Sequence, residues 1–107
     1  MLNLYYVYLL RLAEGMLYVG ITTDPARRLK EHMDKKGSGA KYTRTKTVVG
    51  MECIFQTENR STASSLEYHL KRLPKITKEE IACTGNLKCL QEKIQIQNYV
   101  YVGKKMP

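Results

Sequence analysis

The 107-residue chain contains no tryptophan, one phenylalanine and three prolines. Its cysteines are Cys53, Cys83 and Cys89, which are odd in number, widely spaced and without a histidine at zinc-binding spacing. We therefore expect reduced thiols in a cytoplasmic or nuclear protein rather than a disulfide framework or a zinc site. The apolar stretch at residues 1–12 is short and lacks a basic leader and a cleavage site. Neither a signal peptide nor a membrane span is expected.

Acidic residues are too few to balance the basic ones. Eighteen Lys and Arg residues oppose ten Asp and Glu residues, so the formal net charge is +8, and the sequence pI is about 9.5. Such a charge attracts polyanions, which makes nucleic acid the leading partner. An acidic membrane surface is disfavoured, because the basic residues are not gathered on one helix with a bulky apolar face. The length suits a single domain with one core.

Tyrosine is plentiful, and most of it lies in segments typical of strands. Aromatic and branched residues dominate residues 4–10 and 16–22, with a polar break between them, which predicts a β-hairpin. Residues 47–56 alternate loosely and predict a third strand. The expected fold is α+β: a small three-stranded antiparallel sheet flanked by helices.

The first helix is expected directly after the hairpin. Asp24 can cap it, with Pro25 at its first position. Ala26, Leu29 and Met33 recur at helical spacing and predict its apolar stripe, and the helix should end before residue 37. Residues 37–46 are then predicted to form a loop.

Two further helices follow the third strand. One is expected to begin at Ser61 or Thr62 and to stop at Pro74, and a short one should begin at Thr77. A turn at residues 84–86 separates a domain at 1–82 from an extension at 83–107. In the extension we expect a helix over 87–98, followed at 99–102 by a fourth strand or an extended tail.

Two arginines, Arg27 and Arg28, occupy the first turn of the first helix, where the helix macrodipole disfavours cations. This placement indicates an anion-binding role, and phosphate is the obvious candidate. The preceding strands contain the tripeptides Tyr6-Val7-Tyr8 and Tyr18-Val19-Gly20. Together with the order of the residues that follow, over roughly residues 4–82, they resemble the GIY-YIG nuclease family. The first tripeptide keeps only the final tyrosine of the family's Gly-Ile-Tyr.

The resemblance implies a metal-dependent endonuclease that hydrolyses phosphodiester bonds in DNA, with RNA left open. It implies that Tyr8, as phenolate, accepts a proton from water, and that Tyr18 hydrogen-bonds the water or a phosphoryl oxygen. Arg28 would bind the scissile phosphate, and His32 would relay a proton or contact phosphate. Glu67 would hold Mg²⁺ or Mn²⁺, an ion often bound by only one or two carboxylates.

The same residues have simpler readings that the sequence leaves open. Glu67 can merely pair with Lys71 one helical turn away. Strand tyrosines such as Tyr8 and Tyr18 commonly serve only core packing. A lone histidine such as His32 is often a surface or packing residue.

A second group of basic and aromatic residues is expected to bind the nucleic-acid substrate rather than to take part in the chemistry: Arg27, Lys41, Tyr42, Arg44 and Lys46. The alternative is that they form only a solvated basic loop. No base-reading module is recognisable, so structured or single-stranded targets are favoured over specific sequences. Larger members of the family, among them repair nucleases, attach separate DNA-binding domains. Here targeting would come from a partner protein or be weak. A noncatalytic nucleic-acid-binding module and a protein-docking adaptor remain alternatives.

Overall fold

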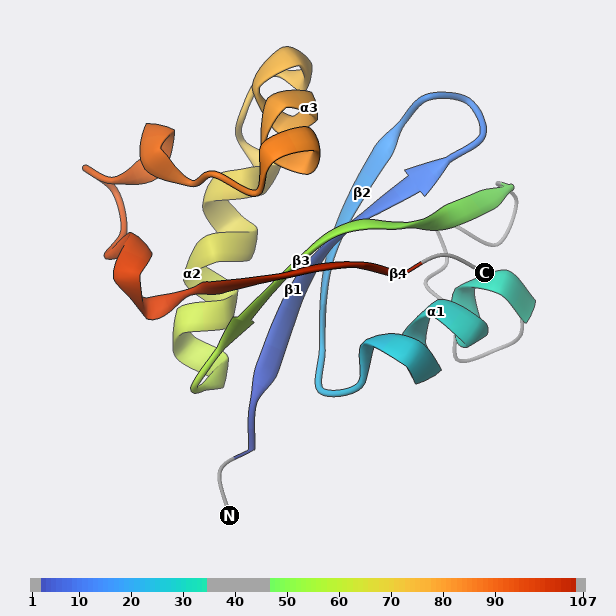
Figure 1. Ribbon diagram of the computed structural model, residues 1–107, viewed down its shortest axis with the longest axis horizontal. Coiled ribbons are helices and arrows are strands. Elements are labelled where there is room, and N and C mark those ends of the chain that lie inside the picture. Colours follow the sequence, from blue (N-terminus) through green and yellow to red (C-terminus); the bar gives the residue numbers. More distant parts are fainter. Residues whose placement is uncertain (1–2, 35–46, 106–107) are drawn as a thin grey trace.

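The computed structural model of the chain describes residues 3–34 and 47–105 (Figure 1). The elements within these residues are, in chain order, β1 (Tyr5–Leu12), β2 (Leu17–Thr22), α1 (Pro25–Asp34), β3 (Val48–Thr57), α2 (Arg60–Lys71), α3 (Lys75–Thr84), the 3₁₀ helices η2 (Lys88–Leu90) and η3 (Ile96–Asn98), and β4 (Val100–Lys105). The α+β class expected from the sequence is confirmed. No helix of this part of the chain combines the length and the apolar character needed to cross a membrane.

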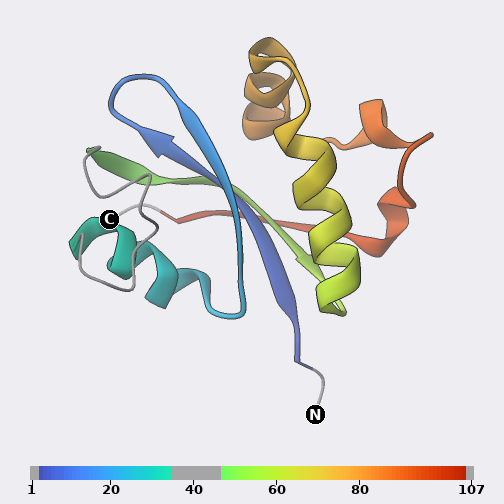
Figure 2. The ribbon, with the colours of Figure 1, turned by 180° about the vertical axis from the view of Figure 1, so that it is seen from behind.

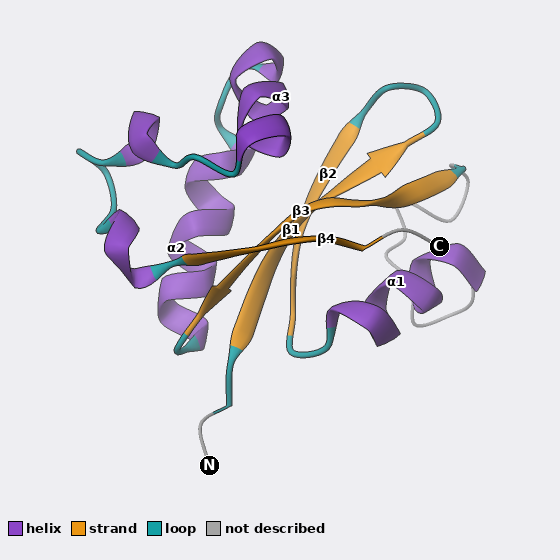
Figure 3. Ribbon diagram, viewed as in Figure 1, coloured by secondary structure: helices purple, strands orange, loops and turns teal. Residues whose placement is uncertain are grey.

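The sheet has four strands in the order β2-β1-β3-β4, and each neighbouring pair is antiparallel. The predicted three-stranded sheet is thus one strand short, because β4 pairs with the outer edge of β3. Tyr8 lies in β1 directly opposite Gly20 of β2 and Ile54 of β3. Figure 3 shows β1 and β3 in the middle of the sheet, with β2 and β4 at its edges.

Two hydrophobic clusters cover the two faces of the sheet. On one face α2 and α3 pack against Val7 and Leu9 of β1. On the other face α1 packs against Tyr8 and Leu10 through Leu29. Strand alternation explains this division, because successive side chains of β1 point to opposite faces. The view from behind in Figure 2 shows α2 on its side of the sheet, away from α1. Tyr8 and His32 consequently belong to the α1 layer.

The start of α1 matches the sequence prediction, but its buried face does not. The Asp24 carboxylate accepts a hydrogen bond from the backbone N–H of Arg27 at 3.1 Å, as expected of a cap. The residues that α1 buries are Leu29 and His32. Met33, predicted to belong to the apolar stripe, is 37% exposed, and Ala26 is exposed as well. The helix is therefore rotated so that a histidine occupies the core side.

α2 and α3 each begin one or two residues earlier than predicted. Asn59 caps α2, with its side-chain oxygen 2.9 Å from the backbone nitrogen of Thr62, so the helix begins before Ser61. α2 ends at Lys71, shortly before Pro74, and α3 begins directly after Pro74. A proline suits the position before a helix because it needs no donor there.

The predicted helix over 87–98 is wrong. Leu87, Leu90 and Ile94 are buried, and their spacing resembles a helical stripe. The backbone forms only η2 and η3, because it must turn to lead β4 back antiparallel to β3. Tyr99 fixes this turn, since its hydroxyl donates a hydrogen bond to the Thr62 carbonyl at 2.7 Å. Of the two alternatives for residues 99–102, the strand is the one observed.

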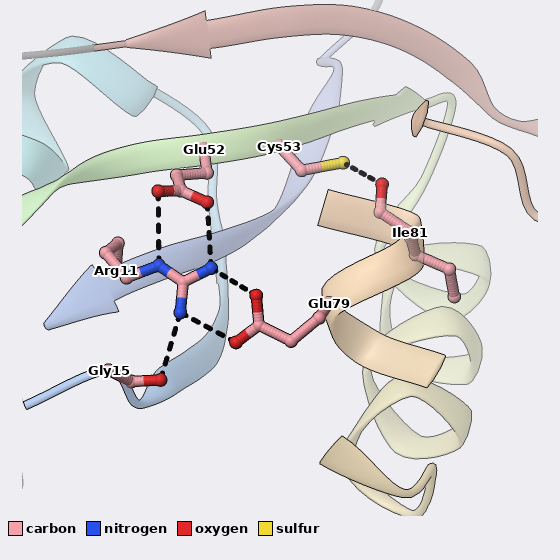
Figure 4. A network of polar contacts seen from close by, with 6 residues as sticks. All are labelled: Arg11, Gly15, Glu52, Cys53, Glu79 and Ile81. Carbon is pink, nitrogen blue, oxygen red and sulfur yellow. Dashed lines mark hydrogen bonds and ion pairs between the residues drawn. The ribbon is translucent and has the colours of Figure 1, made fainter. Parts of the chain in front are cut away.

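Arg11 joins the sheet to α3 through a three-way contact (Figure 4). Its guanidinium group donates two hydrogen bonds to Glu52 of β3, at 3.1 and 3.0 Å, and also binds the Glu79 carboxylate of α3 and the carbonyl oxygen of Gly15. Hydrogen bonding with Arg11 lowers the pKa of Glu79. The contact holds the end of the β1–β2 hairpin against α3.

Candidate active site

The Tyr8 ring crosses over Gly20 of the neighbouring edge strand. The two residues face one another in the β1–β2 pairing, so their side-chain positions point to the same face of the sheet. A Cβ atom at Gly20 would lie only 2.3 Å from the Tyr8 hydroxyl oxygen. The absence of a side chain at Gly20 therefore lets the phenol reach toward the β2 edge.

Tyr8, Tyr18 and His32 form a group of three rings between the sheet and α1. The Tyr8 hydroxyl lies 2.8 Å from Nε2 of His32, and this contact is buried. The His32 ring meets the Tyr8 ring edge-on at a centroid distance of 5.8 Å and the Tyr18 ring at 5.7 Å. His32 is fully buried and Tyr8 is 1% exposed. The structure thus brings together three residues that the sequence analysis assigned to the site.

Burial moves the pKa values of Tyr8 and His32 away from one another. It raises the pKa of Tyr8 to about 12, although hydrogen bonding and charge from Arg28 oppose the rise. It lowers the pKa of His32 to about 4, and the nearby charge of Arg28 adds to this effect. At neutral pH the pair therefore consists of a phenol and a neutral imidazole. The phenolate expected of Tyr8 is not its resting form.

Arg28 lies beside this group on the face of α1 that turns toward the sheet. Its side chain is 21% exposed and forms an ion pair with Glu31 at 2.9 Å. Burial acts to lower the pKa of Arg28, but Glu31 and Tyr8 outweigh it and hold the pKa above its ordinary value. The guanidinium group therefore stays charged, with part of its surface open to an incoming anion.

Glu67 approaches from α2, the helix on the opposite face of the sheet. Its charge acts to raise the pKa of Tyr8, so the carboxylate lies within electrostatic reach of the phenol. The carboxylate also pairs with Lys71 at 3.1 Å, which is the simpler role considered from the sequence. The Lys71 side chain is 53% exposed, and an exposed pair at this spacing contributes only about 0.3–0.5 kcal/mol. Such a weak pair leaves the carboxylate available to a cation.

The donors around Glu67 fit a hydrated ion rather than a protein cage. Among residues 3–34 and 47–105, no group of three or more His, Cys, Asp or Glu side chains is placed to hold a metal ion. Mg²⁺ is often held by one or two carboxylates, with water and substrate phosphate as the remaining ligands. A single partly exposed carboxylate meets that requirement, whereas Zn²⁺ would need more nitrogen or sulfur ligands.

The residues predicted to grip the substrate are described only in part. The Arg27 side chain is 62% exposed, and its Nε atom lies 3.9 Å from the Glu31 carboxylate. The other four predicted residues lie outside the described residues: Lys41, Tyr42, Arg44 and Lys46.

Comparison with known proteins gives a match to the GIY-YIG catalytic domain over residues 4–79. The chain belongs to the GIY-YIG family. The match includes every ring and charged group of the candidate site described above. It ends before η2, η3 and β4, so the fourth strand of the sheet lies beyond the GIY-YIG match.

Named relatives of this GIY-YIG chain are similarly small. A UPF0213 protein of Yersinia pestis (strain Pestoides F) is 48% identical over 79 residues, which cover 74% of this chain and 81% of that protein. A UPF0213 protein of Yersinia pseudotuberculosis (serotype O:3, strain YPIII) matches to the same extent. The solution structure of a UPF0213 protein from Bacillus halodurans is 32% identical, with a TM-score of 0.45, covering 86% of this chain and 97% of that one.

Two residues of this GIY-YIG site were not assigned roles from the sequence. Gly20 has no side chain, and the Tyr8 ring occupies the position where one would lie. Its place as the third residue of the second tripeptide was the available signal. Glu31 pairs with Arg28 at 2.9 Å and approaches Arg27 at 3.9 Å. Helical spacing of three and four residues could have indicated both contacts.

Proposed function

We propose that the chain is a metal-dependent endonuclease that hydrolyses phosphodiester bonds in DNA. The observation that supports this proposal is the buried contact between Tyr8 and His32, with Arg28 beside it and Glu67 within electrostatic reach. A module that only binds nucleic acid needs surface charge, whereas a phenol beside an imidazole and an arginine can also move a proton.

Arg28 has the role of binding the scissile phosphate. Its planar guanidinium group can donate two parallel hydrogen bonds to phosphoryl oxygens, and it stays charged at any working pH. In the structure Glu31 holds this group through an i,i+3 ion pair. An incoming phosphate competes with Glu31 for the arginine, and Glu31 keeps the side chain oriented until then.

Tyr8 and His32 have the role of moving the proton of the attacking water. Tyr8 takes that proton as its own passes to Nε2 of His32, which is 2.8 Å away. In the resting protein this transfer is strongly uphill, because the pKa of Tyr8 is about 12 and that of His32 about 4. A bound phosphate anion raises the pKa of His32 by charge attraction. Substrate binding therefore reduces the difference between the pKa of Tyr8 and that of His32, and the proton transfer becomes less unfavourable.

The negative charge on the phosphoryl oxygens would also be balanced by a cation held at Glu67. A divalent cation such as Mg²⁺ or Mn²⁺, bound by Glu67, would supply positive charge to the phosphoryl oxygens and lower the pKa of the attacking water. Tyr18, whose ring lies 5.7 Å from that of His32, orients the water or a phosphoryl oxygen through its hydroxyl group. Selection of the target is left to a partner protein or to the shape of the nucleic acid.

Substitution of Glu67 tests the proposal. We expect Glu67→Ala to abolish metal-dependent cleavage of labelled single-stranded, duplex and branched DNA, while affinity measured in chelator stays the same or rises, because a negative charge is removed. Lys71→Ala is the matched control, since it breaks the same ion pair and keeps the carboxylate. Equal loss of cleavage in both variants would show that Glu67 acts only by stabilising α2 through its ion pair with Lys71. Absence of cleavage by the wild-type protein on all DNA and RNA substrates would favour a noncatalytic binding module.

A further inference from the structure

A groove lies between the start of α1 and β4. It has a volume of about 290 Å³, and its lining includes Tyr6 and Gln56 from the two middle strands, Pro25 of α1, and Val102, Lys104 and Lys105 of β4. β4 forms the outer edge of the sheet, and Figure 1 shows its far end running toward α1. Because β4 lies beyond the family match, one wall of the groove comes from residues outside the GIY-YIG domain.

The chemistry of the lining favours a nucleic-acid strand. Its charged members are Lys104 and Lys105, and no carboxylate is among the lining residues. Both lysines are exposed, so their ammonium groups can follow phosphates. Tyr6 is half-buried, and Val102 is 46% exposed, which gives the groove an aromatic and apolar surface. Cationic and aromatic groups in one groove are typical of sites for single-stranded nucleic acid.

The position of the groove connects it to the candidate active site. Tyr6 and Tyr8 point to the same face of β1, and at about 3.4 Å per residue their attachment points lie roughly 7 Å apart. The groove therefore lies on the same face of the sheet as Tyr8, toward β4, and a single-stranded segment that crosses this face can contact both. Pro25 at the groove and Arg28 at the site are also within one turn of the same helix.

We propose that the groove between α1 and β4 binds the backbone of a single-stranded segment of the substrate, a few nucleotides from the bond that is cut. Lys104 and Lys105 contact its phosphates, and Tyr6 offers a face for a base or a sugar. This inference rests on the proposed nuclease function and gives β4 a role in it. A groove of about 290 Å³ has room for only a short stretch of one strand.

The test is a double substitution with a matched control. Lys104→Ala/Lys105→Ala removes both groove charges, and Lys88→Ala/Lys93→Ala removes two exposed lysines that are not in the lining. Affinity for a fluorescent single-stranded oligonucleotide is measured by anisotropy in chelator over a range of salt concentrations. We expect the groove variant to weaken binding at least fivefold and to reduce the slope of log affinity against log salt by about 1.4, at roughly 0.7 per lost contact. The control should change neither.

Three results would overturn the inference. Equal losses in both variants would mean a general charge effect, and no loss in the groove variant would mean that its lysines only protect an edge strand from aggregation. A loss confined to duplex DNA would refute the single-strand assignment. Val102→Lys offers an independent check, because an added charge in the groove should tighten binding about threefold. Since binding is measured without metal, a wild-type protein that binds but never cuts would refute the nuclease function alone.

Discussion

The Tyr8 hydroxyl and Nε2 of His32 lie 2.8 Å apart, and both residues are almost completely buried. Desolvation raises the pKa of the phenol and lowers that of the imidazole, so the resting pair holds a single proton between two neutral groups. At neutral pH the Tyr8 phenol and the His32 imidazole are therefore both uncharged when no substrate or cation is bound. The protonation of the pair should therefore respond to a phosphate bound beside it and to a cation held by Glu67.

Tyr8→Phe keeps the ring and deletes the hydroxyl group. If the phenol transfers the proton, single-turnover cleavage should slow by about 10² or more, with substrate affinity little changed. The variant leaves His32 without this buried partner, so the free energy of unfolding should fall by about 1–2 kcal/mol. Turnover near the wild-type level would remove Tyr8 from the chemistry and leave His32 or a metal-bound water as the base.

His32 should make the fold sensitive to acid. Its pKa is 6.5 when unperturbed and about 4 in the folded protein, so the unfolded chain takes up a proton at a higher pH than the folded chain does. The free energy of unfolding should therefore fall as the pH drops from about 6.5 to about 4, by up to about 3 kcal/mol. Urea unfolding at several pH values would measure it. His32→Gln should lack this component of the pH dependence, whereas His69→Gln should retain it.

Arg28→Lys should be much more harmful than Arg27→Lys. Arg28 is 21% exposed beside the phenol, and Arg27 is 62% exposed one residue earlier. Lysine keeps the charge and loses the planar fork, so it can replace an exposed contact better than a bidentate one. We expect single-turnover rates at saturating enzyme to fall about tenfold or more for Arg28→Lys and less than about threefold for Arg27→Lys. The reverse order would place the phosphate on the outer side of α1.

Gly20→Ala should displace the Tyr8 ring. The added Cβ would lie 2.3 Å from the hydroxyl oxygen and 2.4 Å from the ring carbon that bears it. Because that ring is packed in the core, we expect a loss of about 1–3 kcal/mol in unfolding free energy and at least tenfold slower cleavage. Circular dichroism during urea titration and a cleavage assay would measure the two effects. A variant with wild-type activity would show that Tyr8 works equally well in another orientation.

The sequence predicted best those elements that are determined by residues close together in the chain. Two runs of aromatic and branched residues around a polar break predicted the hairpin, and the Asp24-Pro25 start predicted α1, because both signals depend on neighbouring residues. The buried face of α1 was harder to predict, since a histidine scores as polar. His32 occupies the core because Tyr8 gives its nitrogen a partner there. That partner comes from a different element, 24 residues earlier in the chain.

The rest of the site and fold depended on distant contacts. The spacing of Leu87, Leu90 and Ile94 is compatible with a helix, and only the need to return β4 to the edge of β3 breaks it. Likewise, the sequence placed Glu67 one turn from Lys71, but the approach of α2 to the Tyr8 region from the opposite face is a tertiary relationship. Periodicity reports which side of a helix is apolar, not what lies across from it.

The contact of Arg11 with Glu52 and Glu79 also limits how this protein can change over time. Loss of the arginine leaves two carboxylates facing one another, and loss of either carboxylate still leaves the arginine one partner. Arg11 is therefore the position least able to change first. Replacement of one of the two carboxylates should therefore be tolerated better than replacement of Arg11. One guanidinium group thus decides which single substitutions in this contact the protein can accept.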